Sequence, residues 1–193
     1  MKKIALFAAH GSETIESLAA LDVFRRADLE VDFISIESTL NLELSYGTKV
    51  QADRLLSEVN LEDYSVYYLP GGMGEYQGLP GGVQRILSDL GRPIKDYFQQ
   101  NQADPNKLFC AICAAPLAFH EWGLLGPETK FTSFDGVQTD FAQNWVPDHV
   151  VRSGNLFTSR GAGTTIEFAL AVIEAIVDAE TALRVKRGLQ IKN

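Results

Sequence analysis

The segment Leu108–Leu117, with the sequence LFCAICAAPL, constrains this chain more than any other stretch. It begins as an apolar run typical of a buried strand, and a cysteine, two alanines and a proline then follow directly. Proline is tolerated in the first turn of a helix, where its missing N–H would have had no partner. The pattern therefore predicts a strand, a tight turn at Cys113 and Ala114, and a helix entered near Pro116.

The predicted turn gives Cys113 the surroundings of a reactive cysteine. It would end a strand and precede a helix N-terminus, where free N–H groups and the helix dipole favour a thiolate. The alternative is that the cysteine is a small buried hydrophobe, which is a frequent role of this residue type. Apolar neighbours in the strand favour that structural role for Cys110, whereas the local pattern leaves both interpretations open for Cys113.

The spacing of cysteines and histidines argues against redox-dithiol and metal chemistry. Cys110 and Cys113 are spaced as in a redox dithiol, but Cys110 lies inside a predicted strand, so we expect no reversible disulfide. The three histidines, His10, His120 and His149, do not stand at metal-ligand spacing from one another or from a cysteine. We therefore expect neither a metal nor another cofactor.

Apolar strand-like runs alternate with helical segments along the chain. Buried strands are predicted at Lys3–Ala9, Val31–Ile36, Ser65–Leu69 and Lys107–Ile112. Shorter strands are predicted at Phe131–Ser133, Val150–Arg152 and Leu156–Thr158, with a hairpin at Leu42–Val50. The alternation predicts an α/β fold, with a mostly parallel sheet and helices on both faces, in one domain spanning residues 1–193.

Helices are predicted at residues 13–27, 82–90, 93–101, 116–122, 164–177 and 179–188. The first has a broad apolar surface, which suggests that something besides the sheet covers it, for example a second subunit. Thr164 and Glu167 form the T-x-x-E pattern of a capping box at the start of the fifth helix.

Charge and hydropathy exclude several classes of partner. The net charge of -8 disfavours nucleic acid and anionic membrane surfaces, because no basic face is available to replace counterions. The N-terminal segment MKKIALFAAHGSE has a short apolar run that we interpret as a first strand and not as a signal peptide. No apolar segment approaches membrane-spanning length, and we expect a cytoplasmic protein.

Four loops follow predicted strands and should meet at one edge of the sheet. They are residues 10–16, 70–82, 113–116 and 159–164. Ligands of such sheets bind at the carboxyl ends of the strands. Glu16 would then face Cys113, where a carboxyl group could exchange protons with the sulfur, although an acid in a first helical turn also complements the helix dipole.

The remaining candidate residues lie in the same loops. The backbone N–H groups of Gly72 and Met73 could form an oxyanion hole, or the glycine-rich loop could be a plain tight turn; it matches neither common nucleotide-binding motif. Arg160 could bind an anionic group or form a salt bridge in a loop or across a dimer. His10 ends the first strand near the site, where the alternative is a plain turn residue.

Four segments together resemble the ThiJ/PfpI superfamily, in particular its DJ-one branch. They are GSETIESLAALDVFRRA at 11–27, LPGG at 69–72, AICAAP at 111–116 and TSRGAGTTIEFALAVIEAI at 158–176. The resemblance implies a flavodoxin-like three-layer sandwich, usually a homodimer, with Cys113 on a strained turn called a nucleophile elbow. It also implies Glu16 as the partner of the cysteine, a backbone hole at Gly72 and Ala114, and Arg26 near a dimer-facing site.

The chain departs from this resemblance at one position. Many members carry a histidine close to the sulfur in the strand after the cysteine helix, and that position falls at about Phe134. Activation of the thiol is then expected from the helix N-terminus and Glu16, unless His149 or a residue of a partner subunit fills the gap. We therefore do not predict a protease.

The resemblance implies two functions that share every site residue. One is a cofactor-independent glyoxalase or protein deglycase, acting on reactive aldehydes such as methylglyoxal or on glycated proteins. The other is an oxidative-stress sensor or redox-regulated chaperone, in which Cys113 is oxidised to a sulfinate. A small-molecule binding module without chemistry is a third interpretation, and the sequence alone does not separate the three.

Overall fold

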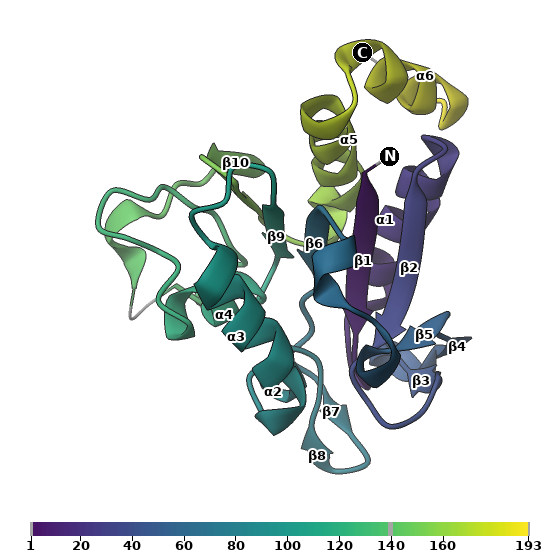
Figure 1. Ribbon diagram of the computed structural model, residues 1–193, viewed down its shortest axis with the longest axis vertical. Helices are drawn as coiled ribbons and strands as arrows, with labels where there is room; N and C mark the ends of the chain where they lie inside the picture. The colour runs from purple at the N-terminus through teal and green to yellow at the C-terminus, as the bar shows by residue number, and fades with distance from the viewer. Residues whose placement is uncertain (1, 139–140, 193) are drawn as a thin grey trace.

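A single twisted sheet organises the chain in the computed structural model, which describes residues 2–138 and 141–192 (Figure 1). The strand order is β10-β11-β9-β6-β1-β2-β5. The strands are β1 (Lys3–Ala8), β2 (Glu30–Ser35), β5 (Arg54–Leu55), β6 (Val66–Leu69), β9 (Leu108–Ile112), β10 (Val150–Ser153) and β11 (Leu156–Ser159). Neighbours pair in parallel except β10 and β11, which are antiparallel.

Helices cover both faces of this sheet, so the fold is the predicted flavodoxin-like α/β sandwich. One face carries α1 (Thr14–Arg26), α5 (Thr165–Ile176) and α6 (Ala179–Gly188), and the other carries α2 (Val83–Ile86), α3 (Arg92–Asn101) and α4 (Pro116–Glu121). Successive residues of a strand point to opposite faces. In β1, Ile4 and Leu6 belong to the first core, and Ala5 and Phe7 belong to the second.

Part of the apolar surface of α1 is covered by another helix of the same chain. Ala20, Val23 and Phe24 are buried in the same core as Phe168 and Val172 of α5. A second subunit is therefore not needed to bury these residues. The expectation that something besides the sheet covers this helix is confirmed for these positions, where the cover is α5 of the same chain, while Ile15 stays 54% exposed.

Two predicted helices have different boundaries in the structure. The helix expected at residues 82–90 ends after Ile86, and a separate turn follows at η4 (Asp89–Gly91). Gly91 packs directly against the Ile86 carbonyl, so the chain bends sharply there. The next helix, α3, begins at Arg92 with Pro93 in its first turn, where a proline is tolerated.

The strand predicted at Phe131–Ser133 does not form. Phe131 makes only an isolated bridge with Trp145. The Thr132 N–H donates to the Thr158 hydroxyl and not to a strand carbonyl. A side-chain hydroxyl and loop residues thus replace the backbone ladder of a strand.

The capping box predicted at Thr164 and Glu167 is also absent. The Thr164 hydroxyl bonds to Ser159 and Gly161 instead of capping α5. The Glu167 carboxylate lies 2.9 Å from the His149 ring nitrogen. Both polar groups are engaged by residues that precede the helix, so neither completes the reciprocal cap.

Two hairpins project from one end of the sheet, at the opposite end of the molecule from α6 (Figure 1). The predicted hairpin consists of β3 (Asn41–Glu43) and β4 (Lys49–Gln51), joined by η1 (Ser45–Gly47). The glycine-rich loop contains a second hairpin that was not predicted, formed by β7 (Glu75–Tyr76) and β8 (Leu79–Pro80). Across residues 2–138 and 141–192, no helix has the length and apolar character needed to cross a bilayer.

Candidate active site

Cys113 lies on a strained turn between β9 and α4. Its φ angle is 63°, in the left-handed region that is uncommon for residues other than glycine. Its N–H donates to the Ser159 carbonyl at 2.9 Å, and its carbonyl accepts from the Phe134 N–H at 2.8 Å. These two bonds hold the unusual backbone conformation from both sides, as the term nucleophile elbow implies.

Glu16 is fully buried and is held by partners from three parts of the chain. Its Oε2 accepts a hydrogen bond of 2.7 Å from the Gly71 N–H, and its backbone carbonyl accepts from the Tyr68 hydroxyl at 3.1 Å. Its own N–H donates to the Glu13 carboxylate, which caps α1. The other carboxyl oxygen, Oε1, is buried without a hydrogen-bonding nitrogen or oxygen among the described residues.

Two glycines allow the loop after β6 to approach this carboxyl group and the cysteine. A Cβ on Gly71 would lie 2.8 Å from both Cys113 Cβ and Glu16 Oε2. Gly72 has a φ of 105°, and a Cβ there would collide with the Gly11 carbonyl. The Gly-Gly pair is therefore required by close packing, beyond the needs of a simple turn.

Glu16 and Cys113 perturb each other's ionisation. Burial raises the pKa of Glu16 to about 7, although bonds from Gly71 and Cys113 oppose the shift. Burial and the Glu16 carboxylate raise the pKa of the Cys113 thiol, while hydrogen bonds from the Ala114 and Gly72 N–H groups lower it. The N–H groups favour the thiolate as expected, but burial and the Glu16 carboxylate, which was expected to assist activation, raise the pKa of the thiol and outweigh them.

A cavity of about 560 Å³ opens onto Cys113 and Glu16. All four loops expected to converge contribute to it, together with the β3–β4 hairpin. Its remaining lining residues are Gly11, Glu13, Ser45, Tyr46, Gly72, Met73, Gly74, Glu75, Ala114, Phe134 and Ala162. The predicted backbone hole residues Gly72, Met73 and Ala114 thus lie in the same cavity as the sulfur.

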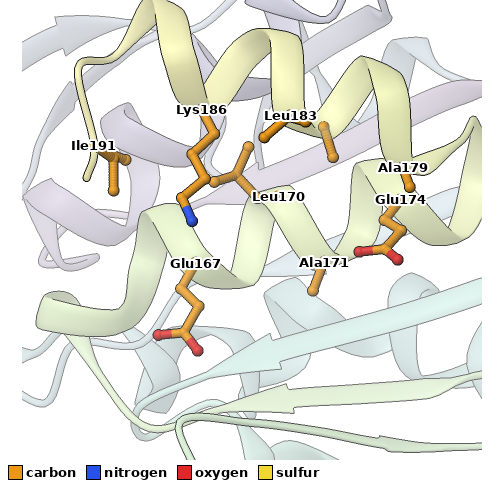
Figure 2. Close-up of a pocket in the computed structure, with 9 residues that line it drawn as sticks. Glu167, Leu170, Ala171, Glu174, Ala179, Leu183, Lys186 and Ile191 are labelled. Atoms are coloured by element: carbon orange, nitrogen blue, oxygen red, sulfur yellow. The ribbon is translucent and has the colours of Figure 1, made fainter. Parts of the chain in front are cut away.

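Another cavity, of about 580 Å³, lies between α5 and α6 (Figure 2). Its lining residues include Leu170, Leu183 and Ile191, with the Lys186 ammonium directed toward the Glu167 side (Figure 2). Its lining, among the residues that the structure describes, includes no cysteine, serine or histidine. Size alone therefore does not distinguish the candidate site, whereas the presence of a nucleophile beside a buried acid does.

Three residues predicted near the site lie outside the Cys113 cavity. His10 stacks on Tyr76 at 3.8 Å and accepts a bond from the Glu43 N–H through Nδ1, beside a different cavity. Arg26 is at the far end of α1 and pairs with Asp22 on the same helix. Arg160 borders an adjoining cavity, where it pairs with Asp135.

No histidine of the described residues lies beside Cys113 in place of the one that Phe134 replaces. His149 is exposed and bonded to Glu167, and the residues that line the Cys113 cavity include no histidine. Phe134 itself lines the cavity with 54% of its surface exposed. Over the part of the chain that the structure describes, no three His, Cys, Asp or Glu side chains are grouped to hold a metal ion.

Sequence reasoning missed several residues of the site. Gly71, which binds Glu16, was treated only as part of a glycine-rich loop, although two adjacent glycines after a buried strand signal a close approach of backbone. Tyr46 and Glu75 line the cavity from the two hairpins. No local pattern could place them there, because their position depends on how the hairpins fold over the sheet edge.

The fold and the site together define an α/β protein in which an elbow cysteine faces a buried carboxyl group. The DJ-1/PfpI family model matches residues 2–175, and the chain belongs to this family.

Three relatives illustrate the range of similarity. The chain is 34% identical to Protein DJ-1 homolog B of Arabidopsis thaliana over 99% of its own length and 42% of that protein, so it spans less than half of this relative. It is 25% identical to a Schizosaccharomyces pombe protein named glutathione-independent glyoxalase DJ-1, over 99% of this chain and 100% of the other. The solved structure of oxidized Toxoplasma gondii DJ-1 aligns with a TM-score of 0.89 and 32% identity, covering 100% of both chains.

Proposed function

We propose that this protein converts reactive aldehydes such as methylglyoxal without a cofactor, as a glyoxalase or as a deglycase that removes aldehyde adducts from proteins. The single observation that carries the proposal is the pairing of Cys113 with Glu16, whose pKa is raised to about 7 by burial. A base with a pKa near the working pH transfers protons efficiently in both directions. The name of the fission-yeast relative supports the same activity.

In the first step the Cys113 sulfur attacks the aldehyde carbon. The C–S bond forms as the carbonyl π electrons move to oxygen, and ionised Glu16 takes the thiol proton. The N–H groups of Gly72 and Ala114, which hydrogen-bond the sulfur in the resting site, can stabilise the negative charge that develops beside it. Return of the proton from Glu16 to the oxygen gives a neutral hemithioacetal.

In the second step Glu16 moves a proton between adjacent carbons. It removes the proton from the former aldehyde carbon and delivers one to the neighbouring carbonyl carbon, while the hydroxyl proton passes to the neighbouring oxygen. The result is a thioester of a hydroxy acid. Water hydrolyses the thioester, which releases lactate from methylglyoxal and restores the thiol, so the overall reaction adds one water to the substrate.

The test is turnover of methylglyoxal by the purified protein in the absence of glutathione and with a chelator present. Cys113→Ser should lower the rate at least 100-fold, since a hydroxyl is a far weaker nucleophile. Cys110→Ala is the matched control, because Cys110 is fully buried in β9 and lines no part of the cavity. Equal activity of Cys113→Ser and the parent protein would refute the proposal.

A second candidate function is redox sensing through the same sulfur. The observation that favours it is the set of hydrogen-bonding groups around Cys113, namely Glu16 and the Gly72 and Ala114 N–H groups, which could hold the oxygens of a sulfinate. The structurally similar Toxoplasma gondii protein is described in an oxidized form. Intact mass after mild peroxide tests this function, and failure to gain two oxygens at Cys113 would count against it.

The homodimer and the cytoplasmic location belong to the same proposal. Arg26 is exposed at the far end of α1, so any role for it would be in a contact between subunits and not in the cavity of its own chain. Sedimentation equilibrium of the parent protein and Arg26→Ala tests the dimer. A monomer at micromolar concentration would contradict it.

A further inference from the structure

The charged groups that line the Cys113 cavity all have one sign. Glu13, Glu16 and Glu75 contribute carboxyl groups, and no lysine, arginine or histidine is among the lining residues. Two cationic side chains border neighbouring cavities instead. Arg160 pairs with Asp135 at 2.5 Å beside an adjoining cavity, and Lys49 borders the separate cavity next to His10.

Glu75 is positioned by anchored neighbours. Gly74 accepts a hydrogen bond of 2.8 Å from the Gly81 N–H, which closes the base of the β7–β8 hairpin. Tyr76 stacks on His10 with a centroid separation of 3.8 Å. The backbone of Glu75 is thus held on both sides, and this exposed residue lines the cavity.

The large side chains that line the cavity, apart from its carboxylates, are apolar or aromatic. Tyr46, Met73 and Phe134 line the cavity and are 96%, 57% and 54% exposed. A ligand that enters therefore meets apolar surface and negative charge, with no cation to receive a carboxylate or phosphate. Because these side chains are exposed to solvent, the repulsion of an anion acts through a high dielectric and is reduced by salt.

We propose that Glu75, supported by Glu13, makes the Cys113 cavity a charge filter that admits neutral and cationic electrophiles and excludes anionic ones. The inference deepens the proposed function, since it assigns uncharged aldehydes to the site and disfavours those that bear a carboxylate or phosphate. It requires from that function only that Cys113 is the reacting nucleophile. Glu75 is a specificity-determining residue and takes no part in bond making.

The experiment compares alkylation of Cys113 by iodoacetamide, which is neutral, and iodoacetate, which is anionic. In each case the sulfur forms a C–S bond, iodide leaves, and the thiol proton passes to Glu16 or solvent. Peptide mass spectrometry separates Cys113 from Cys110. The rate with iodoacetamide is divided by the rate with iodoacetate. This ratio is then divided by the same ratio for N-acetylcysteinamide, a small neutral thiol, which removes the intrinsic difference in reactivity between the two reagents.

For the parent protein the normalised ratio should be at least about 5 at low ionic strength, and it should fall as salt screens the carboxylates. Glu75→Gln should lower it at least about twofold, and Glu75→Lys should lower it further. Glu180→Gln is the control, because it removes one negative charge from exposed α6 at the other end of the molecule (Figure 1). It should leave the ratio unchanged.

A normalised ratio near 1 in the parent protein would overturn the charge filter, and so would equal effects of Glu75→Gln and Glu180→Gln. Failure of both reagents to modify Cys113 would also overturn it, since the cavity would then admit neither. Methylglyoxal turnover, measured on the same samples, separates the two proposals. Charge-selective alkylation without turnover refutes the proposed function alone, whereas turnover without charge selectivity refutes the filter alone.

Discussion

The Gly71 amide nitrogen lies 2.7 Å from Glu16 Oε2, and this contact joins the loop after β6 to the first helix. The same glycine approaches Cys113 so closely that a Cβ would lie 2.8 Å from the Cys113 Cβ. One backbone unit therefore positions the acid and leaves space for the nucleophile. The relationship explains why the candidate site depends on a residue without a side chain.

Gly71→Ala should abolish aldehyde turnover and destabilise the protein. Its methyl group would overlap Glu16 Oε2 and Cys113 Cβ, so the acid or the elbow must move. The matched control is Gly74→Ala in the same loop, where an added Cβ meets nothing within 4 Å. Turnover and the thermal midpoint should both drop for Gly71→Ala alone, and equal behaviour of the two variants would contradict the close-packing explanation.

Turnover should rise with pH through an apparent pKa of about 7, because Glu16 must be ionised to accept the thiol proton. Glu16→Gln removes the base and should lower kcat at least 100-fold. The rate that remains should not rise with pH through this pKa. The measurement is the pH profile of kcat for both proteins. If kcat of Glu16→Gln still rises with pH through the same apparent pKa, a group other than Glu16 causes the rise.

Glu16 should also make stability depend on pH. Its pKa is 4.5 in the unfolded chain and about 7 in the fold, so between these values the folded protein keeps a proton that the unfolded chain has lost. The stability that Glu16 contributes is complete below the lower value and declines as the pH rises through the upper one, by about 3 kcal/mol in total.

Urea unfolding of the parent protein and Glu16→Gln measures this contribution. Between about pH 4 and about pH 8, the difference in unfolding free energy should shift by about 3 kcal/mol in favour of the glutamine variant. A difference that stays constant over this range would mean that Glu16 is not a buried acid with a raised pKa.

Phe134→His should increase the reactivity of the cysteine. The Phe134 N–H bonds to the Cys113 carbonyl, and its side chain lines the cavity, so an imidazole there can accept the thiol proton. Iodoacetamide modification of Cys113 near neutral pH should accelerate several-fold. Phe134→Leu opens the cavity without adding a base. If modification of Cys113 accelerates equally in that variant, the cause is easier entry of the reagent and not a new base.

The stacked rings of His10 and Tyr76 should hold the β7–β8 hairpin against the sheet edge. Tyr76→Ala removes this contact and should speed hydrogen–deuterium exchange across residues 74–81, with a smaller change in β1. Tyr76→Phe keeps the ring and should exchange at the parent rate. Unchanged exchange in Tyr76→Ala would indicate that the hairpin is held by its backbone bonds alone.

Much of the architecture was predictable because it follows from local patterns. Strand β9 and helix α4 lie where the run LFCAICAAPL predicts them, and α6 spans the predicted residues 179–188. Uninterrupted apolar runs indicate strands covered on both faces. The alternation with helices then leaves few arrangements of a parallel sheet, and this is why the family resemblance and the fold agree.

Errors occurred where a segment's partners come from distant parts of the chain. Phe131 bonds through its backbone to Asn144 and Val146 of a loop, and the Thr132 N–H donates to the Thr158 side chain instead of a strand carbonyl. Thr164 and Glu167 have the pattern of a cap but bond to Ser159 and His149. A polar side chain can hydrogen-bond to any group that the fold brings near it, whereas a short motif includes only partners within a few residues in the sequence.

The sequence by itself determined that Cys113 stands on a strand-to-helix turn, with an acid and a glycine loop at the same sheet edge. Only the tertiary structure decided how those groups interact. Burial and the contact with Glu16 raise the pKa of the Cys113 thiol, whereas its local turn alone predicts a lower one. Local geometry is set by neighbouring residues, but solvation and charge depend on every element that closes over the site.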